Sequence, residues 1–333
     1  MAITWIDGFE DYDSSNGLLS QAYTTAGLGS ITYGSTGRFS GSSLNLGFVT
    51  TAIRKGISTT STVAVGHAFK LLLASGGATV QALAFRDASA NTIAGLFFNP
   101  DGGLVFVRGS TVSSNVLATA PSGTVSVDAW YYLEVEFTRH ASAGAVNVYL
   151  NGALIMSASG VNTGAADVAA VAIIAPVNGY LVDDLYITDT ASRIGEVRID
   201  TLVPTADTAQ KDFTASTGSD NYAMVGELPV DGDTSYVQAD VAGAADLYTT
   251  DGLADTPDAI YAVQVRVAAK KLDTGFRSIK AKLKSGTTEA DGAAVALATD
   301  YAVATAIHET DPATDAAWTA SGVNAAQIGM EIG

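Results

Sequence analysis

The sequence predicts an all-β protein that is built from two β-sandwich domains. Strand-like segments separated by turn residues fill almost the whole chain, and no segment shows the periodicity of a long amphipathic helix. The length of 333 residues suggests about two domains. Regular short strands with frequent turn signals are typical of β-sandwiches, so we expect one sandwich in each half of the chain.

The segment 130–155 shows the strand pattern most plainly. Polar and apolar residues alternate over 131–138, and the same period of two returns over 146–150. A short polar break between the two runs suits a hairpin loop. Asn151-Gly152 is a strong hairpin signal, because both residues tolerate positive φ. We therefore predict a three-strand meander with one buried face and one solvent-exposed face.

Other strands follow from the same signals. The residues Asn-Pro-Asp-Gly-Gly at 99–103 place Pro and Gly for a tight turn between two apolar strands. On strict alternation, Asp183 shares a face with Leu181, Leu185 and Ile187. The further strands are expected at 63–73, 93–98, 104–108, 180–188, 260–268, 276–284, 301–307 and 326–332.

The polar stretch 188–195 marks a domain boundary, because a new strand is expected at 196–200 directly after it. We place the first domain at 1–192 and the second, an anchoring or assembly domain, at 193–333. The chain ends inside an expected strand, so we expect no tail. The sequence contains no heptad repeat and no collagen-like repeat, so we do not predict an elongated fibre shaft.

Composition excludes several classes of function. The net charge of −17 argues against binding to nucleic acid or to an anionic membrane. The chain has no Cys, which excludes disulfides and Cys-ligated metals. We see no signal peptide and no apolar run of the ~18 residues that a membrane span needs. We therefore expect a protein that is made and assembled in a cytoplasm.

The first 190 residues or so resemble the concanavalin A-like (laminin-G/pentraxin-like) jelly roll. Four motifs carry the resemblance, and they follow one another in the family's order. They are RFSGSSLNL at 38–46, WYYLEVE at 130–136, VNVYLNG at 146–152 and VDDLYI at 182–187. The resemblance implies that the first domain is a lectin-type jelly roll.

The opening WIDGFEDY at 5–12 and the motif WTASGVNAAQIG at 318–329 are similar to structural proteins of tailed bacteriophages. This resemblance implies a protein on the virion surface, as a capsid decoration, head spike or tail-associated protein. Its partners would be other virion proteins and further copies of itself, and we expect a trimer. Since no motif supplies catalytic groups, we expect no enzymatic activity.

An alternative function is a carbohydrate-binding adhesin that contacts host surface glycans. The candidate sugar-binding residues are Tyr149, Asn151, Asn178 and Tyr180. Trp130 suits either stacking on a sugar or packing in a core strand. A third hypothesis, a glycan hydrolase, would use Glu134 and Glu136, which are two apart on one strand face. The E-x-D-x-x-E pattern of jelly-roll glucanases is missing from the sequence.

Three carboxylates are weak candidates for a Ca²⁺ site, because hard oxygen ligands suit that ion. They are Asp101, Asp183 and Asp184. The competing interpretation is that a buried Asp accepts hydrogen bonds from the neighbouring backbone. No cofactor is required by the sequence. The three His residues have no partners at metal-ligand spacing, and we assign no chemistry to them.

Basic residues gather in the second half of the chain. The candidates for an assembly interface are Lys271, Arg277, Lys280, Lys282 and Lys284. The last three share one face of an expected strand. They would either protect a sheet edge against aggregation or form a docking stripe for an acidic surface. Docking of this kind would weaken as salt is added.

Overall fold

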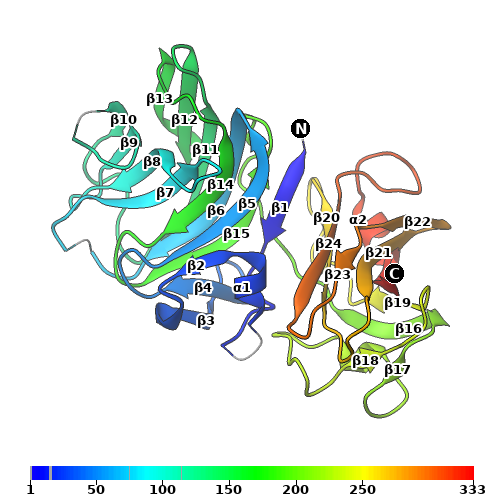
Figure 1. The fold of residues 1–333 in the computed structure, drawn as a ribbon. Helices are drawn as coiled ribbons and strands as arrows, with labels where there is room; N and C mark the ends of the chain where they lie inside the picture. The colour runs from blue at the N-terminus through cyan, green and yellow to red at the C-terminus, as the bar shows by residue number, and fades with distance from the viewer. Residues whose placement is uncertain (1, 15–16, 75, 114) are drawn as a thin grey trace. The chain divides into compact units, whose positions relative to one another are not determined.

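The chain folds into two units made almost entirely of β-strands (Figure 1). The computed structural model describes residues 2–14, 17–74, 76–113 and 115–333. Unit 1 contains the residues up to Glu10 and Tyr23–Ile199, and unit 2 contains Asp11–Ala22 and Asp200–Gly333. The predicted all-β fold is confirmed. Within the described residues, the helices are too short and too polar to span a membrane.

Unit 1 is a sandwich of two antiparallel sheets. The eight-stranded sheet has the order β13 (Ala153–Val161), β12 (Gly144–Leu150), β11 (Trp130–Thr138), β6 (Thr62–Leu71), β15 (Tyr180–Thr188), β4 (Ser42–Leu46) and β3 (Ile31–Thr36), with β1 (Ile3–Asp7) paired to β15. The seven-stranded sheet has the order β10 (Val116–Ala120), β9 (Leu104–Arg108), β8 (Thr92–Phe98), β7 (Val80–Arg86), β14 (Val168–Ile174), β5 (Ala52–Thr60) and β2 (Thr24–Ala26). The 3-10 helix η1 (Leu28–Ser30) precedes β3. The arrangement confirms the predicted jelly-roll sandwich.

Aromatic side chains fill the space between the two sheets. The ring centroids of Phe69 on β6 and Phe98 on β8 are 5.4 Å apart, and Phe137 on β11 stacks at 4.6 Å on Phe85 of β7. All four side chains are buried. Because side chains alternate along a strand, the odd-numbered residues of β6 and β11 face this core. Their even-numbered residues form what we call the outer face of the eight-stranded sheet.

The meander predicted from the sequence is confirmed as β11, β12 and β13. Glu134 of β11 lies directly opposite Tyr149 of β12, and Glu136 lies opposite Asn147. The turn after β12 places Asn151 at φ 49° and Gly152 at φ 77°, the left-handed backbone that an Asn-Gly hairpin turn adopts.

A β-bulge in β15 changes the face on which its side chains lie. Asp183 pairs with Ala68 of β6, but Tyr186 pairs with Gly66, so β15 holds one extra residue. Asp184 takes up this residue with a φ of 50°. Asp183 and Tyr186 therefore lie on the outer face, whereas Leu185 and Ile187 point into the core. The expectation that Asp183 shares a face with Leu185 is wrong for this reason.

Residues 189–199, here called the covering segment, cross the outer face of the eight-stranded sheet after β15. Ile194 and Val197 pack on Tyr132 and Tyr186. The backbone N–H of Ile199 donates a 2.8 Å hydrogen bond to Asp184 Oδ1. The strand expected at 196–200 is not formed. Side chains of the sheet bind its residues 193–199, and at its start the Asp189 N–H donates to the Ala2 carbonyl at 3.0 Å.

Unit 2 is built around a six-stranded sheet. Its order is β16 (Pro204–Lys211), β19 (Ala245–Thr250), β25 (Gln327–Ile332), β21 (Ser278–Ser285) and β22 (Thr288–Asp291), with β23 (Val295–Ala296) paired to β21. Two further pairs are β17 (Thr214–Ala215) with β18 (Val237–Gln238), and β20 (Val263–Ala269) with β24 (Ala302–His308). The short helices are η2 (Tyr222–Met224) and α2 (Ala320–Ala325). Trp318 is buried with Val265 and Leu283 in one core cluster of this unit.

Unit 2 also contains a piece of the N-terminal sequence. Residues 11–22, which end in helix α1 (Leu18–Ala22), group with this unit, and α1 lies against β24. Tyr12, Leu18 and Leu19 are buried. Arg266 of β20 donates a 2.7 Å hydrogen bond to the Tyr12 hydroxyl. Unit 2 therefore includes a segment that precedes most of unit 1 in the sequence.

Candidate functional site

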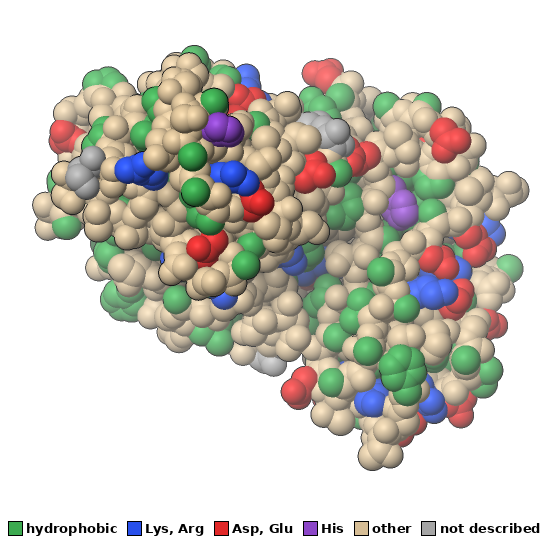
Figure 2. Space-filling model, turned by 45° about the horizontal axis from the view of Figure 1, so that its top comes forward, with side chains coloured by type: hydrophobic (Ala, Val, Ile, Leu, Met, Phe, Trp, Pro, Cys, Tyr) green, Lys and Arg blue, Asp and Glu red, His purple; other side chains and the backbone are tan. Residues whose placement is uncertain are grey.

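Uncharged side chains and backbone dominate the face of the molecule in Figure 2, and charged side chains form small separate groups. This agrees with a sequence in which only 15% of residues are charged. One group of polar residues on the outer face of unit 1 combines charge, amide and aromatic ring. These polar residues lie on β11 and β12. The even-numbered residues of β11 and the odd-numbered residues of β12 point to that face.

Glu134 anchors the covering segment to the sheet. Its side chain has no exposed surface. Its Oε1 accepts hydrogen bonds from the Tyr186 hydroxyl at 2.7 Å and from the Gly195 N–H at 2.9 Å. Its Oε2 accepts one from Arg193 Nη1 at 2.6 Å. Burial, and next the charge of Glu134, raise the pKa of Tyr186, so this hydroxyl stays a donor.

Glu136 lies two residues after Glu134 on β11, on the same face of the sheet, and its side chain is half-buried. Its Oε2 accepts hydrogen bonds from Asn147 Nδ2 at 3.0 Å and from the Tyr149 hydroxyl at 3.2 Å. Its Oε1 accepts one from the backbone N–H of Arg193 at 3.1 Å. The Arg193 guanidinium carbon lies 4.1 Å from the centroid of the Tyr149 ring. We call Glu136, Asn147, Tyr149 and Arg193 the Tyr149 platform.

The Tyr149 platform is held in place but remains open to solvent. Each of its four residues is partly exposed. Burial raises the pKa of Tyr149, with the nearby charge of Glu136 as the second cause. The platform thus offers a neutral hydroxyl, an amide, a carboxylate and a guanidinium beside one aromatic ring. Hydrogen bonds within the group fix their positions before any ligand arrives.

The structure separates the four predicted sugar-binding residues. Tyr149 and Asn151 belong to the same hairpin, where the exposed Asn151 accepts a 2.8 Å hydrogen bond from the Tyr132 N–H through its side chain. Asn178 is exposed on a different loop. Tyr180 is fully buried. The expectation of an exposed Tyr180 is wrong, because its side chain points into the core.

His67 and Trp130 pack inside unit 1 and have a structural role. The Tyr180 hydroxyl lies 3.2 Å from Nε2 of His67, and burial lowers the pKa of His67 to about 3. This histidine is therefore neutral at ordinary pH. Trp130 is partly buried and packs in the cluster of Tyr132 and Tyr186. The packing interpretation of Trp130 fits this position.

The predicted Ca²⁺ ligands do not come together as an ion site. Asp101 caps its own hairpin by accepting hydrogen bonds from Gly103 N–H at 2.9 Å and from Ser122 Oγ. Asp183 and Asp184 lie at the bulge of β15, where Asp183 Oδ2 accepts a 2.7 Å hydrogen bond from the Arg38 N–H. No group of three or more acidic or His side chains is placed to hold a metal within residues 2–14, 17–74, 76–113 and 115–333.

The lysine stripe of unit 2 faces carboxylates of its own sheet. The predicted assembly residues on β21 are Lys280, Lys282 and Lys284. Lys282 Nζ lies 2.7 Å from Glu331 of β25 and 3.2 Å from both Glu289 and Asp291 of β22. Lys280 Nζ lies 3.1 Å from Glu331, and the third lysine lies opposite Glu289 in the ladder. This face is therefore balanced in charge.

The other two assembly candidates lie in the loop between β20 and β21. Arg277 Nη2 is 3.0 Å from Asp273 Oδ2, and Lys271 Nζ donates to the backbone carbonyl of Gly275. The loop also carries Leu272 and Phe276, whose side chains are strongly exposed.

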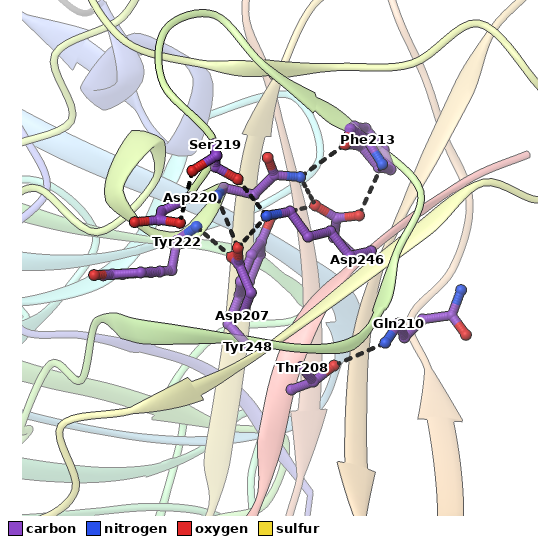
Figure 3. A network of polar contacts seen from close by, with 11 residues as sticks. Asp207, Thr208, Gln210, Phe213, Ser219, Asp220, Tyr222, Asp246 and Tyr248 are labelled. Carbon is purple, nitrogen blue, oxygen red and sulfur yellow. Dashed lines mark hydrogen bonds and ion pairs between the residues drawn. The ribbon is translucent and has the colours of Figure 1, made fainter.

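A second polar network is buried in unit 2 and was not predicted (Figure 3). Asp246 has no exposed surface and accepts hydrogen bonds from Phe213 N–H at 2.9 Å, Asn221 Nδ2 at 2.6 Å and Tyr248 hydroxyl at 2.7 Å. Asp207 accepts from the N–H of Tyr222 at 2.7 Å. These bonds fix the loop between β16 and β19, which is a structural role.

Arg193 was also not among the predicted site residues. This residue lies in the polar stretch that we took for a domain boundary. A signal did exist, since Glu134 and Glu136 share one strand face and two neighbouring carboxylates need a cation or several donors. The distance of 59 positions between Arg193 and Glu134 hides their contact.

No family model matches the chain, and no curated protein matches its sequence. Among the solved structures that resemble part of it at low identity are the following three. The Cellulose induced protein Cip1 is 17% identical over 58% of this chain and 100% of that chain, with a TM-score of 0.42. A Trypanosoma rangeli sialidase in complex with the inhibitor DANA is 14% identical over 49% of this chain and 27% of that chain, with a TM-score of 0.36. The carbohydrate binding module CBM66 from Bacillus subtilis is 15% identical over 50% of this chain and 94% of that chain, with a TM-score of 0.33.

These comparisons concern the fold alone, which is a β-sandwich. They require one correction. The prediction that the chain is not an enzyme is contradicted, because the similar structures include sialidases and a variant that displays trans-sialidase activity. The structures named here are not virion proteins. The phage resemblance and the virion location stay predictions of the sequence.

Proposed function

We propose that unit 1 binds carbohydrate at the Tyr149 platform. The observation that carries the proposal is the 4.1 Å stack of Arg193 on Tyr149, with Glu136 and Asn147 hydrogen-bonded beside it on a partly exposed sheet face. This proposal takes up the alternative of a carbohydrate-binding adhesin. The Bacillus subtilis module above is named for the same class of ligand, but the proposal rests on the geometry.

The chemistry of the platform suits sugar hydroxyls. A hydroxyl donates and accepts at once, so it pairs well with a carboxylate and a guanidinium or amide that lie side by side. Tyr149 is partly exposed and combines an apolar ring, stacked on Arg193, with a polar hydroxyl. Because the four residues are already fixed by hydrogen bonds, binding would order few side chains.

Glycan-array screening of the full chain, followed by calorimetry with the best glycan, tests the proposal. Tyr149→Ala and Asn147→Ala should each weaken binding about tenfold or more, which is about 1.4 kcal/mol. Tyr236→Ala, which removes an exposed tyrosine of unit 2, is the matched control and should bind like the unchanged protein. An array without any bound glycan, or equal losses in all three variants, would refute the platform.

A structural role in a tailed-phage particle is the second candidate function. The exposed loop of residues 270–277 favours it, because the loop carries two of the predicted assembly residues on unit 2. In this case the protein would lie on the virion surface and contact other virion proteins. Mass spectrometry of purified particles should then find its peptides at a fixed ratio to the major capsid protein. Their absence from particles would count against this role.

A further inference from the structure

Two carboxylates and one guanidinium meet at the Tyr149 platform. Arg193 Nη1 lies 2.6 Å from Oε2 of Glu134, whose side chain has no exposed surface, so the positive charge is paired with a buried partner. Glu136 accepts its hydrogen bonds from uncharged donors, which are the Asn147 amide, the Tyr149 hydroxyl and a backbone N–H. The partly exposed Glu136 therefore gives the open side of the platform one negative charge in excess.

The pKa of Tyr149 indicates which charge acts more strongly at its hydroxyl. Burial is the first cause that raises this pKa, and the negative charge of Glu136 is the second. The positive charge of Arg193 lowers the same pKa and has a smaller effect than Glu136. A ligand group that binds beside this hydroxyl is therefore in a negative potential.

The strand beyond Tyr149 adds no charge to this face. β13 is the last strand of the eight-stranded sheet (Figure 1), and none of its residues is charged. Its exposed residues Leu154 and Ser157 lie directly opposite Tyr149 and Asn147 of β12. Residues that pair in an antiparallel ladder point to the same face. A ligand on this face would therefore contact hydroxyls, an amide and apolar groups beside the carboxylate of Glu136.

We propose, on the basis of the carbohydrate-binding function above, that the Tyr149 platform selects neutral glycans over glycans with carboxylate or sulfate groups, and that Glu136 sets this preference. A sugar hydroxyl can donate to Glu136 and accept from Asn147 or Arg193. An ionised carboxylate or sulfate group has no proton to donate, and the charge of Glu136 repels it. The net charge of −17 adds to this repulsion at low salt.

Glycan arrays probed with the full chain test the preference through matched pairs of glycans. The two members of a pair share a neutral core, such as N-acetyllactosamine, and differ by one sialic acid or one sulfate group. Calorimetry on the best pair should give about tenfold tighter binding of the neutral member at low salt, because like charges a few ångströms apart repel strongly at a protein surface. The difference should shrink in about 0.5 M NaCl, which screens exposed charges.

Two variants that each remove one negative charge test the role of Glu136. Glu136→Gln keeps an acceptor oxygen for Asn147 and Tyr149, and it should bring the two members of a pair to within about twofold in affinity. Glu289→Gln, in unit 2, is the matched control and should keep the preference of the unchanged protein. Circular dichroism checks that both variants are folded, and the salt series on the unchanged protein needs no variant.

Three outcomes would overturn the preference while carbohydrate binding itself stands. The first is an acidic member that binds as tightly as its neutral partner. The second is a preference that salt does not change, which would point to the shape of the site in place of its charge. The third is an equal preference in Glu136→Gln and Glu289→Gln. An array without any bound glycan refutes the proposed function, and the preference is then refuted with it.

Discussion

Glu134 accepts three hydrogen bonds at a position where its side chain has no exposed surface. A buried carboxylate of this kind costs desolvation, and its donors offset that cost. The donors come from β15 and from the covering segment. Glu134 therefore joins two segments that are distant in sequence, and it is not free to act as the acid or base of a hydrolase.

Glu134→Gln should destabilise the protein by about 1–3 kcal/mol, because the amide loses the charge-assisted bond to Arg193 and presents a donor to existing donors. Urea unfolding followed by circular dichroism measures the change. Glu289→Gln is the control and should cost less than about 0.5 kcal/mol, since Glu289 is half-exposed and Lys282 keeps two other carboxylates. Equal losses in the two variants would contradict the structural role of Glu134.

Asp183 should make the stability of unit 1 depend on pH. Burial, and next the charge of Asp184, raise the pKa of Asp183 to about 7 from its ordinary value of 3.8. Two backbone N–H donors and the Arg38 guanidinium act in the opposite direction. The folded state therefore holds a proton that the unfolded state has released between these two values. The contribution of Asp183 is fully present below about pH 3.8 and is lost as the pH rises through 7.

Thermal unfolding between pH 4 and pH 8 tests this dependence. One proton gives a slope of at most about 1.4 kcal/mol per pH unit, with lower stability at higher pH. Asp183→Asn should remove this part of the slope, although it also weakens one backbone hydrogen bond at every pH. Slopes that agree in the two proteins would show that Asp183 does not titrate in this range.

At the scale of elements, local patterns predicted strands well and their partners poorly. β11, β12 and β13 follow from alternation and from the Asn151-Gly152 turn, because a hairpin needs only neighbouring residues. The bulge at Asp184 left no such signal, since β15 has no Gly or Pro to mark it. The covering segment alternates like a strand because Val197 packs on the sheet. An alternating pattern shows that one side of a segment is buried, but it does not show that the segment pairs with a neighbouring strand.

The bulge also restricts which residues can replace Asp184, because this residue has a positive φ. Its φ of 50° is a left-handed conformation that β-branched residues avoid, and its Oδ1 accepts the Ile199 N–H. Asp184→Val should therefore cost about 2–4 kcal/mol, from backbone strain and the lost hydrogen bond. Asp184→Asn tolerates the same φ and keeps an acceptor, so it should cost about 1 kcal/mol. Urea unfolding compares them, and similar costs would argue against the bulge geometry.

At the scale of the whole molecule, residues 11–22 show why a division of the sequence at one point is incomplete. The strand signals of the second half are local, and four of its main strands were expected from them. The segment that covers β24 comes from the other end of the sequence, and nothing near residue 200 indicates it. The Tyr149 platform was likewise half predicted, because Arg193 reaches it only through the tertiary fold.

A fragment of residues 200–333 should consequently fold poorly by itself. Without residues 11–22, the surface of β24 under Leu18 and Leu19 is exposed, and Arg266 loses its bond to the Tyr12 hydroxyl. Burying two leucines contributes about 3–6 kcal/mol, which is a large part of the stability of a domain this size. The fragment should therefore show a broad, early thermal transition, and a synthetic peptide of residues 11–22 should restore a cooperative one.

The same peptide with Leu18→Ser and Leu19→Ser is the control for that experiment. It keeps Tyr12 and the length of the segment, so it should bind weakly and leave the transition broad. If the fragment alone unfolds as cooperatively as unit 2 in the full chain, residues 11–22 are an accessory to that unit. If only the unmodified peptide restores cooperativity, unit 2 depends on a segment made first, and the chain must fold its two ends together before that unit is complete.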